Sequence, residues 1–247
     1  IFTPVSTQTT LLYPGSIGGV EWGSPAIDPQ TGILYSNTNA LAFDVRLVPR
    51  NPSGTGLLAR ADRKFHRWML YWTPSSDLPP DLRFRAPDTA GHELSAQAGT
   101  PYQIFREALI SPSGYPCTPQ PWSALVAINL NTGKKLWSEP LGTIIAGQNT
   151  GSLSSGGPIL TGGHLIFSAS TFDPYLRAFD PTSGHELWRG QLPGAAQATP
   201  MTYQIGKRQF VVICSGGSAS RGGSLNDSVV AFALPETTDT TRKTPHH

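Results

Sequence analysis

The side chains that could act as nucleophiles, redox groups or metal ligands are few in this chain of 247 residues. Its two cysteines, Cys117 and Cys214, form no CxxC pair and have no histidine at ligand spacing, which argues against a zinc site or a thioredoxin-like redox pair. A disulfide between them stays open, because the sequence fixes nothing of their geometry. Two histidines, His164 and His185, fall in expected turns, and we expect them to be exposed rather than catalytic.

Short motifs for phosphate binding and hydrolysis are also missing. The sequence has no GxxxxGK[ST], no GxGxxG between a strand and a helix, no GxSxG and no HExxH. Its glycine pairs are interpreted as turns or close backbone approaches, with phosphate binding as the alternative. These pairs are Gly18-Gly19, Gly156-Gly157, Gly162-Gly163, Gly216-Gly217 and Gly222-Gly223. No generic motif therefore indicates a reaction, and the function depends on which elements position the polar residues.

The composition favours many short strands and turns. The chain has 26 Gly and 23 Pro, and only 14% of its residues are charged. Its formal net charge of +2 is too small to indicate a nucleic-acid partner. No apolar run approaches the ~18 residues that a membrane-spanning helix needs. The composition therefore predicts a β-rich protein that does not bind nucleic acid.

One segment of the chain is repeated. Leu125–Trp137 (LVAINLNTGKKLW) and Leu176–Trp188 (LRAFDPTSGHELW) align without a gap, and their Ala, Gly, Leu and Trp recur 51 residues later. A repeat of about 50 residues built from short strands is typical of a β-propeller blade. In each copy a strand ends in a turn at Gly133 or Gly184, where glycine adopts a positive φ without steric cost. The Trp that ends the next strand is expected to lie between one blade and the next.

The repeat predicts an all-β fold, a β-propeller of four-stranded antiparallel blades. We expect three blades, at residues 16–49 together with 120–142, 155–193 and 196–235, with an insertion at 50–119 and a disordered tail at 236–247. The last blade is expected to lack its outermost strand. Three blades cannot close a ring and would leave open edges, so we interpret the chain as a fragment whose remaining blades lie elsewhere.

The insertion is the least propeller-like part. Leu57–Trp72 places its apolar residues on one helical face and predicts an amphipathic helix packed across one end of the propeller. Its basic and aromatic mixture leaves a membrane-surface helix as the alternative. The Pro-rich segment that ends at Pro101 is expected to be a loop, and Arg106–Pro119 an ordered loop over the channel mouth.

Four stretches, taken in order, resemble the dehydrogenases that depend on pyrroloquinoline quinone (PQQ), and among them the membrane-bound quinoprotein glucose dehydrogenases. The stretches are the N-terminal segment that includes Gly19–Gly23 (GVEWG), then Ser113–Trp122 (SGYPCTPQPW), Leu192–Tyr203 (LPGAAQATPMTY) and Gln209–Gly217 (QFVVICSGG). The resemblance implies an eight-bladed propeller with PQQ in a central funnel and Ca²⁺ or Mg²⁺ beside it. It implies oxidation of an aldose or of a polyol or alcohol at the periplasmic side of the bacterial inner membrane, with electrons passed to ubiquinone.

The resemblance also implies which residues face the cofactor. Glu21 and Trp22 match polar and aromatic groups on an innermost strand, Asn37 matches an asparagine near PQQ, and Asp173 matches an aspartate that helps to organise the site. These side chains supply the stacking surface, hydrogen-bond donors and carboxylates that PQQ and a cation require. Structural alternatives stay open, because Trp22 could be a wedge between blades and Asn37 or Asp173 could cap a turn.

The C-terminal stretch adds the remaining site residues. Gly216 and Gly217 are expected at the cofactor, and Ser218 stands where the glucose enzymes usually carry a histidine close to the sugar. The substrate is therefore left open between an aldose and a polyol or alcohol. The resemblance places the catalytic residues upstream of this chain, so we expect the C-terminal portion of an enzyme, inactive alone. A non-catalytic PQQ-like scaffold and a carbohydrate-binding propeller are the alternatives.

Overall fold

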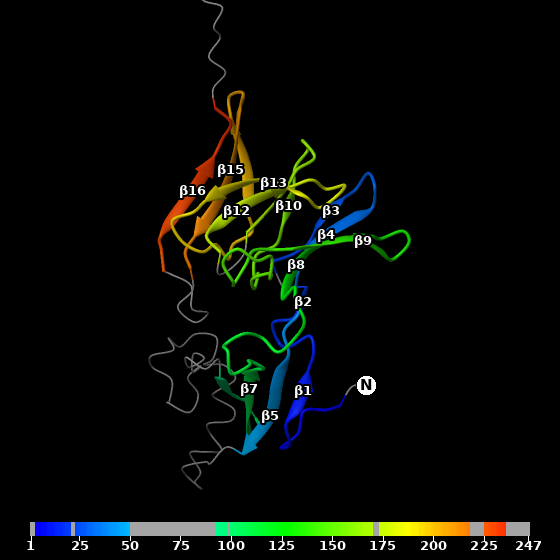
Figure 1. Ribbon diagram of the computed structural model, residues 1–247, viewed down its shortest axis with the longest axis vertical. Helices are drawn as coiled ribbons and strands as arrows, with labels where there is room; N and C mark the ends of the chain where they lie inside the picture. The colour runs from blue at the N-terminus through cyan, green and yellow to red at the C-terminus, as the bar shows by residue number, and fades with distance from the viewer. Residues whose placement is uncertain are drawn as a thin grey trace, which may run out of the picture.

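The computed structural model describes residues 3–20, 23–49, 92–97, 99–169, 173–217 and 225–235. All regular elements in these ranges are β-strands, and every sheet is antiparallel (Figure 1). The expected all-β class is therefore confirmed. The expected helix at 57–72 and the tail at 236–247 lie outside the described residues.

The first blade is interrupted in sequence but continuous in space. Its strands run in the order β2-β4-β8-β9, and β3 also pairs with β4. Their bounds are Gly19–Val20 for β2, Ala26–Asp28 for β3, Ile33–Asn39 for β4, Ser123–Asn129 for β8 and Lys134–Pro140 for β9. The chain leaves this sheet after β4 and returns at β8, with Tyr35 opposite Ala127. We expected the first blade to include residues up to 49, whereas Phe43–Pro49 pairs with strands of another sheet. The chain therefore leaves the blade earlier than the expected insertion at 50–119.

The second blade is uninterrupted, and the third has three strands among the described residues. The second runs in the order β10-β11-β12-β13 and the third in the order β14-β15-β16. The bounds are Ile159–Leu160 for β10, Ile166–Ala169 for β11, Tyr175–Phe179 for β12, Glu186–Gln191 for β13, Met201–Ile205 for β14, Arg208–Ser215 for β15 and Ser228–Phe232 for β16. This arrangement agrees with a last blade that lacks its outer strand.

A fourth sheet was not predicted. It joins β1 (Thr10–Leu12), β5 (Phe43–Pro49), β7 (Tyr102–Ala108) and β6 (His92–Ala96) in the order β1-β5-β7-β6. It lies apart from the three blades (Figure 1). The expected loops before Pro101 and from Arg106 are therefore wrong where β6 and β7 lie. Strand β7 forms because β5, which lies far back in the sequence, supplies a partner along its whole length.

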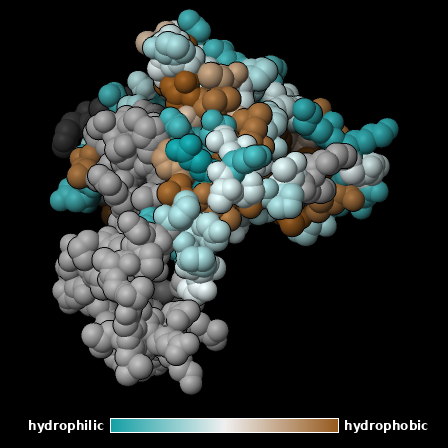
Figure 2. Space-filling model, turned by 90° about the horizontal axis from the view of Figure 1, so that it is seen from below, coloured by the Kyte–Doolittle hydropathy of each residue, from teal (hydrophilic) through white to brown (hydrophobic). Residues whose placement is uncertain are grey.

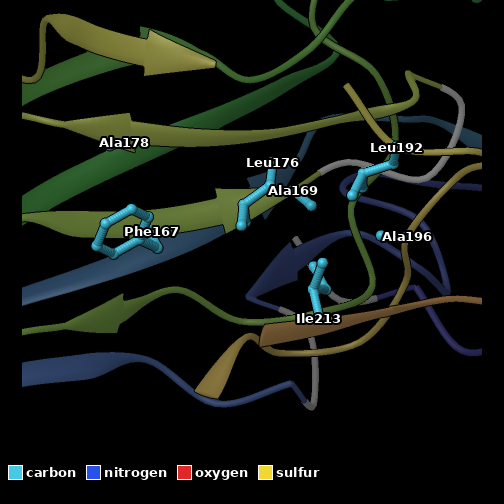
Figure 3. Close-up of a cluster of buried hydrophobic side chains, with 7 residues drawn as sticks. All are labelled: Phe167, Ala169, Leu176, Ala178, Leu192, Ala196 and Ile213. Carbon is cyan, nitrogen blue, oxygen red and sulfur yellow. The ribbon is translucent and has the colours of Figure 1, made fainter. Parts of the chain in front are cut away.

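Two apolar clusters join neighbouring blades. One contains Tyr35 and Leu125 of the first blade with Ile166 and Phe179 of the second. The other joins the second blade to the third through Phe167, Ala169, Leu176, Ala178, Leu192, Ala196 and Ile213 (Figure 3). Burying one such Leu, Ile or Phe side chain stabilises the fold by roughly 1.5–3 kcal/mol, so packing between blades is a principal source of stability.

The third blade leaves large apolar side chains in contact with solvent. On the face shown in Figure 2, hydrophobic and hydrophilic side chains are interspersed. The exposed apolar residues of this blade and its flanks include Met201, Ile205, Leu225, Val229 and Leu234. A neighbouring blade covers such positions in a closed propeller. The described residues therefore leave this face of the third blade uncovered.

The two repeated tryptophans lie between blades, as predicted. Trp137 packs against Tyr35 at 5.9 Å between ring centroids and donates its indole N–H to the carbonyl of Pro181 in the second blade at 2.9 Å. Trp188 of the second blade meets Phe232 of the third edge to face at 5.1 Å. Each tryptophan thus connects its own blade to the following one.

Gly184 and Gly133 provide a matched test of this contact. Both have positive φ, so alanine strains the backbone at either position. A Cβ at Gly184 would lie 2.6 Å from the Trp137 ring, whereas a Cβ at Gly133 would meet nothing within 4 Å. We expect Gly184→Ala to lower the melting temperature by several degrees more than Gly133→Ala, measured by tryptophan fluorescence. Equal shifts would contradict the packing of Trp137 against this turn.

Asp or Asn side chains cap three turns at the same end of the blades, and two of the three caps are acidic. Asp180 accepts hydrogen bonds from the Thr182 N–H at 2.9 Å and the Ser183 hydroxyl at 2.7 Å, and Asp28 is bonded in the same way by Gln30 and Thr31. These bonds lower the pKa of both carboxyls below the ordinary value of 3.8. In the third turn the uncharged Asn129 side chain accepts the equivalent N–H groups.

The lowered pKa values make these caps sensitive to acid. Their stabilisation is fully present above about pH 4 and is lost as the pH falls through the pKa of the folded state. We expect Asp180→Asn to flatten the acid-induced loss of stability below about pH 4, because the amide does not titrate. Melting temperatures across this pH range provide the test. A decline as steep as that of the wild type would show that the cap is not titrating.

Candidate functional site

The candidate site lies where the second strand of each blade ends. Asn37 and Asn39 lie near the end of β4, Asp173 follows β11, and Gly216 follows β15. Ser154 joins the first two of these ends, because its N–H donates to the Asn39 side chain at 3.0 Å and its hydroxyl to the Ala169 carbonyl at 3.2 Å. The ends of β11 and β15 share one apolar cluster. The structure therefore brings the described candidate residues to one face of the blades.

Asn37 is a buried link between the first two blades. Its Nδ2 lies 2.8 Å from the Ser154 hydroxyl, 2.7 Å from the Gly156 carbonyl and 2.9 Å from the Ser168 hydroxyl. Ser168 in turn donates to Asn37 Oδ1 at 3.1 Å. Both amide hydrogens are thus accounted for within the protein. Because Asn37 lies within β4 rather than in a turn, the turn-cap alternative does not apply to it.

Asn39 extends this network and was missed by the sequence reasoning. Its Nδ2 donates to the carbonyls of Ile17 at 3.1 Å and Ser154 at 2.9 Å. The signal was present, because Asn37 and Asn39 are two residues apart in a strand and so share a face. The expected close approach at Gly156-Gly157 is also found, since a Cβ on Gly157 would collide with backbone atoms of Gly23 and Ser24.

Asp173 lies in a buried ion pair. Its Oδ2 accepts from Arg177 Nη2 at 2.6 Å and from the Thr143 N–H at 3.1 Å. Arg177 Nε donates to Glu186 Oε2 at 3.1 Å, and the other oxygen of Glu186 binds Arg189. This last hydrogen bond raises the pKa of Arg189 above its ordinary value. Asp173 Oδ1, in contrast, is buried with no partner among the described residues.

A polar cleft of about 240 Å³ lies beside this ion pair. It is lined by Pro140, Gly142, Thr143, Gly147, Gln148, Asn149, Arg177, Glu186 and Arg189. Arg177 and Arg189 both lie over the ring of Tyr175, at 5.4 Å and 5.7 Å from its centroid. The sequence reasoning did not select Arg177, yet a signal existed. It stands in the repeat where the first copy has the apolar Val126.

Gly216 and Gly217 connect two loops at the same face. Gly217 has a φ of 65° and donates its N–H to the Ala195 carbonyl at 2.9 Å, while the Gly216 carbonyl accepts from the Asn226 N–H at 3.0 Å. A residue with a side chain would be strained at Gly217. The other expected site residues, Glu21, Trp22 and Ser218, lie outside the described residues.

The described cysteines and turn histidines take no part in the hydrogen bonds of the candidate site given above. Cys117 and Cys214 are free and exposed, so the disulfide that the sequence left open is not formed. His164 and His185 are exposed, as expected. In the ranges that the structure covers, no helix is long and apolar enough to cross a membrane.

Comparison with known proteins gives the family. The family profile described as "PQQ: Glucose/ethanol/alcohol dehydrogenase, beta-propeller domain" matches residues 1–211. The chain belongs to the PQQ β-propeller dehydrogenase family. It is 35% identical to quinoprotein glucose dehydrogenase of Escherichia coli over 96% of its own length and 28% of that protein. It is also 34% identical to the glycerol dehydrogenase large subunit of Gluconobacter thailandicus, over 95% of this chain and 31% of that protein.

Other relatives act on other compounds, as their names state. The chain is 32% identical to quinate/shikimate dehydrogenase (quinone) of Acinetobacter baylyi over 95% of its own length and 27% of that protein. It thus spans between a quarter and a third of the length of these relatives. Quinohemoprotein alcohol dehydrogenase from Comamonas testosteroni is 18% identical, with a TM-score of 0.53 over 94% of this chain and 29% of that structure. This structural likeness supports the propeller fold.

The buried polar atoms at this face fit a PQQ ligand in part. Asp173 Oδ1 is an acceptor and Gln197 Nε2 a donor, and both are buried without a partner in the described ranges. PQQ offers donors and acceptors on its rings and carboxylates, so it could satisfy both. No three His, Cys, Asp or Glu side chains converge within the described part of the chain.

The buried hydrogen bonds of Asn37 are expected to stabilise the fold. Asn37→Ala leaves the Gly156 carbonyl and the Ser154 and Ser168 hydroxyls without their shared partner, which costs about 1–3 kcal/mol. We expect a melting temperature several degrees below that of the wild type. Asn149→Ala is the control, because Asn149 is an exposed residue of the cleft. If both variants melt together, the network around Asn37 contributes nothing to stability.

Proposed function

We propose that this chain is the C-terminal part of a PQQ-dependent dehydrogenase that oxidises an aldose or a polyol or alcohol. The similarity to quinoprotein glucose dehydrogenase over 96% of the chain carries the proposal. Relatives named for glucose, quinate or shikimate, and glycerol all act on compounds with several hydroxyl groups. The resemblance of Leu192–Gly217 to the C-terminal signature of the family supports the position within the enzyme.

In this proposal the described residues form one wall of the cofactor site. Bound PQQ would supply the two-electron acceptor, with Ca²⁺ or Mg²⁺ beside it. Asp173 would accept a hydrogen bond from the cofactor, and Gly216 and Gly217 would allow its close approach. Asn37 would hold the wall in place through its links between blades. Glu21 and Trp22 would face the cofactor, and Ser218 the substrate.

The remaining parts of the reaction belong to the rest of the enzyme. No residue of this chain is proposed as the catalytic base, which we place in the other blades of the propeller. We propose that electrons pass to ubiquinone and that the site lies at the periplasmic side of the bacterial inner membrane. Both statements rest on the resemblance to membrane-bound quinoprotein glucose dehydrogenases.

The test compares the full-length protein that contains this chain with the 247-residue chain alone. Each is loaded with PQQ and Ca²⁺ or Mg²⁺, and dye reduction is measured with glucose, glycerol and quinate. We expect PQQ-dependent turnover of at least one substrate by the full-length protein and negligible turnover by the chain, because the base is missing. Full-length protein that binds no PQQ would support a scaffold instead. Turnover by the chain alone would place the catalytic residues here.

A further inference from the structure

The ion pair between Asp173 and Arg177 is buried at unusual cost. Each side chain is at most 4% exposed. Removing two charges from water is expensive, and their attraction compensates only where further hydrogen bonds complete both groups. Arg177 meets this condition through Glu186, whereas Asp173 meets it at only one of its two oxygens.

Both hydrogen bonds to the Asp173 carboxylate are made to the same oxygen, Oδ2. Oδ2 accepts from both Arg177 and the Thr143 N–H, so the carboxylate is held at that oxygen. Oδ1 is left buried and unpartnered among the described residues. An unsatisfied buried acceptor is costly, and one way in which a protein completes such a group is to bind a ligand, an ion or a water molecule there. The missing partner must be an N–H or O–H donor, or a cation.

Arg177 is also bound by a second acidic side chain, Glu186. Its Nη2 points to Asp173 and its Nε to Glu186 Oε2, so two bonds fix the plane of the guanidinium. The ring of Tyr175 lies at 5.4 Å from the guanidinium carbon. A lysine could supply the charge at this position but not the planar pair of directed donors.

We propose that Arg177 is a positioning residue, which holds Asp173 so that Oδ1 is presented to a hydrogen-bond donor of bound PQQ, with Glu186 fixing Arg177. This inference rests on the proposed function and extends it to two residues that the family resemblance did not mark. Arg189 binds the same Glu186 through its other oxygen and makes no contact with Asp173 in the described network. It is therefore a matched control.

The test is a fluorescence titration of PQQ into the full-length apoenzyme, with a melting curve for each variant. We expect Arg177→Met to weaken PQQ binding at least tenfold, Arg177→Lys to restore it only in part, and Arg189→Met to remain within twofold of the wild type. Arg177→Met leaves an uncompensated buried carboxylate, so its folding is checked by the melt.

The double variant Asp173→Asn/Arg177→Met removes both charges and keeps the test decisive if the single variant does not fold. We expect it to melt near the wild type and still bind PQQ at least tenfold more weakly. If the ion pair has only a structural role, removing both charges should restore both the melting temperature and the affinity for PQQ. The inference is overturned if the double variant and Arg177→Lys bind PQQ within twofold of the wild type. A wild-type protein that binds no PQQ would overturn the proposed function itself, and this inference with it.

Discussion

The side-chain amide of Asn37 joins the first two blades at the end where the candidate site lies. A four-stranded blade has no closed core of its own, so its faces are stabilised by its neighbours. The apolar clusters supply most of that stabilisation, but they do not set the direction in which the ends of the strands meet. The hydrogen bonds from Asn37 to Ser154, Gly156 and Ser168 do so, because they are directional and buried. Asp173 is placed on the wall that these links hold.

The two ends of the blades are built differently. At one end, turns at residues 28–32, 129–133 and 180–184 are closed by local Asx-type hydrogen bonds and by the inter-blade contact of Trp137. At the other, buried polar side chains bond over more than a hundred residues of sequence, and buried polar atoms that include Asp173 Oδ1 have no partner in the described ranges. Local repeats stabilise the first end, and a site can develop at the second.

The sequence predicted the features that depend on local pattern. The blades, their turns and the inter-blade tryptophans follow from a repeat whose residues are close in sequence. The sheet that contains β5 and β7 was missed, because its pairing joins strands that lie far apart in the sequence and neither strand shows its partner. Among the described site residues, the family resemblance indicated Asn37, Asp173, Gly216 and Gly217. Asn39 was missed because its buried partner Ser154 is distant in the sequence. Arg177 was missed although it interrupts an apolar position of the repeat and its two acidic partners are near in the sequence.

We propose that PQQ binds against the face where the second strands end. Hydrogen–deuterium exchange of the full-length protein with and without PQQ tests it most directly. We expect PQQ-dependent protection in segments 141–157, 173–177, 192–199 and 213–217, and unchanged exchange in the turns at 28–32, 129–133, 180–184 and 205–208. Protection confined to those turns, or bound PQQ that leaves all of these segments unchanged, would contradict it.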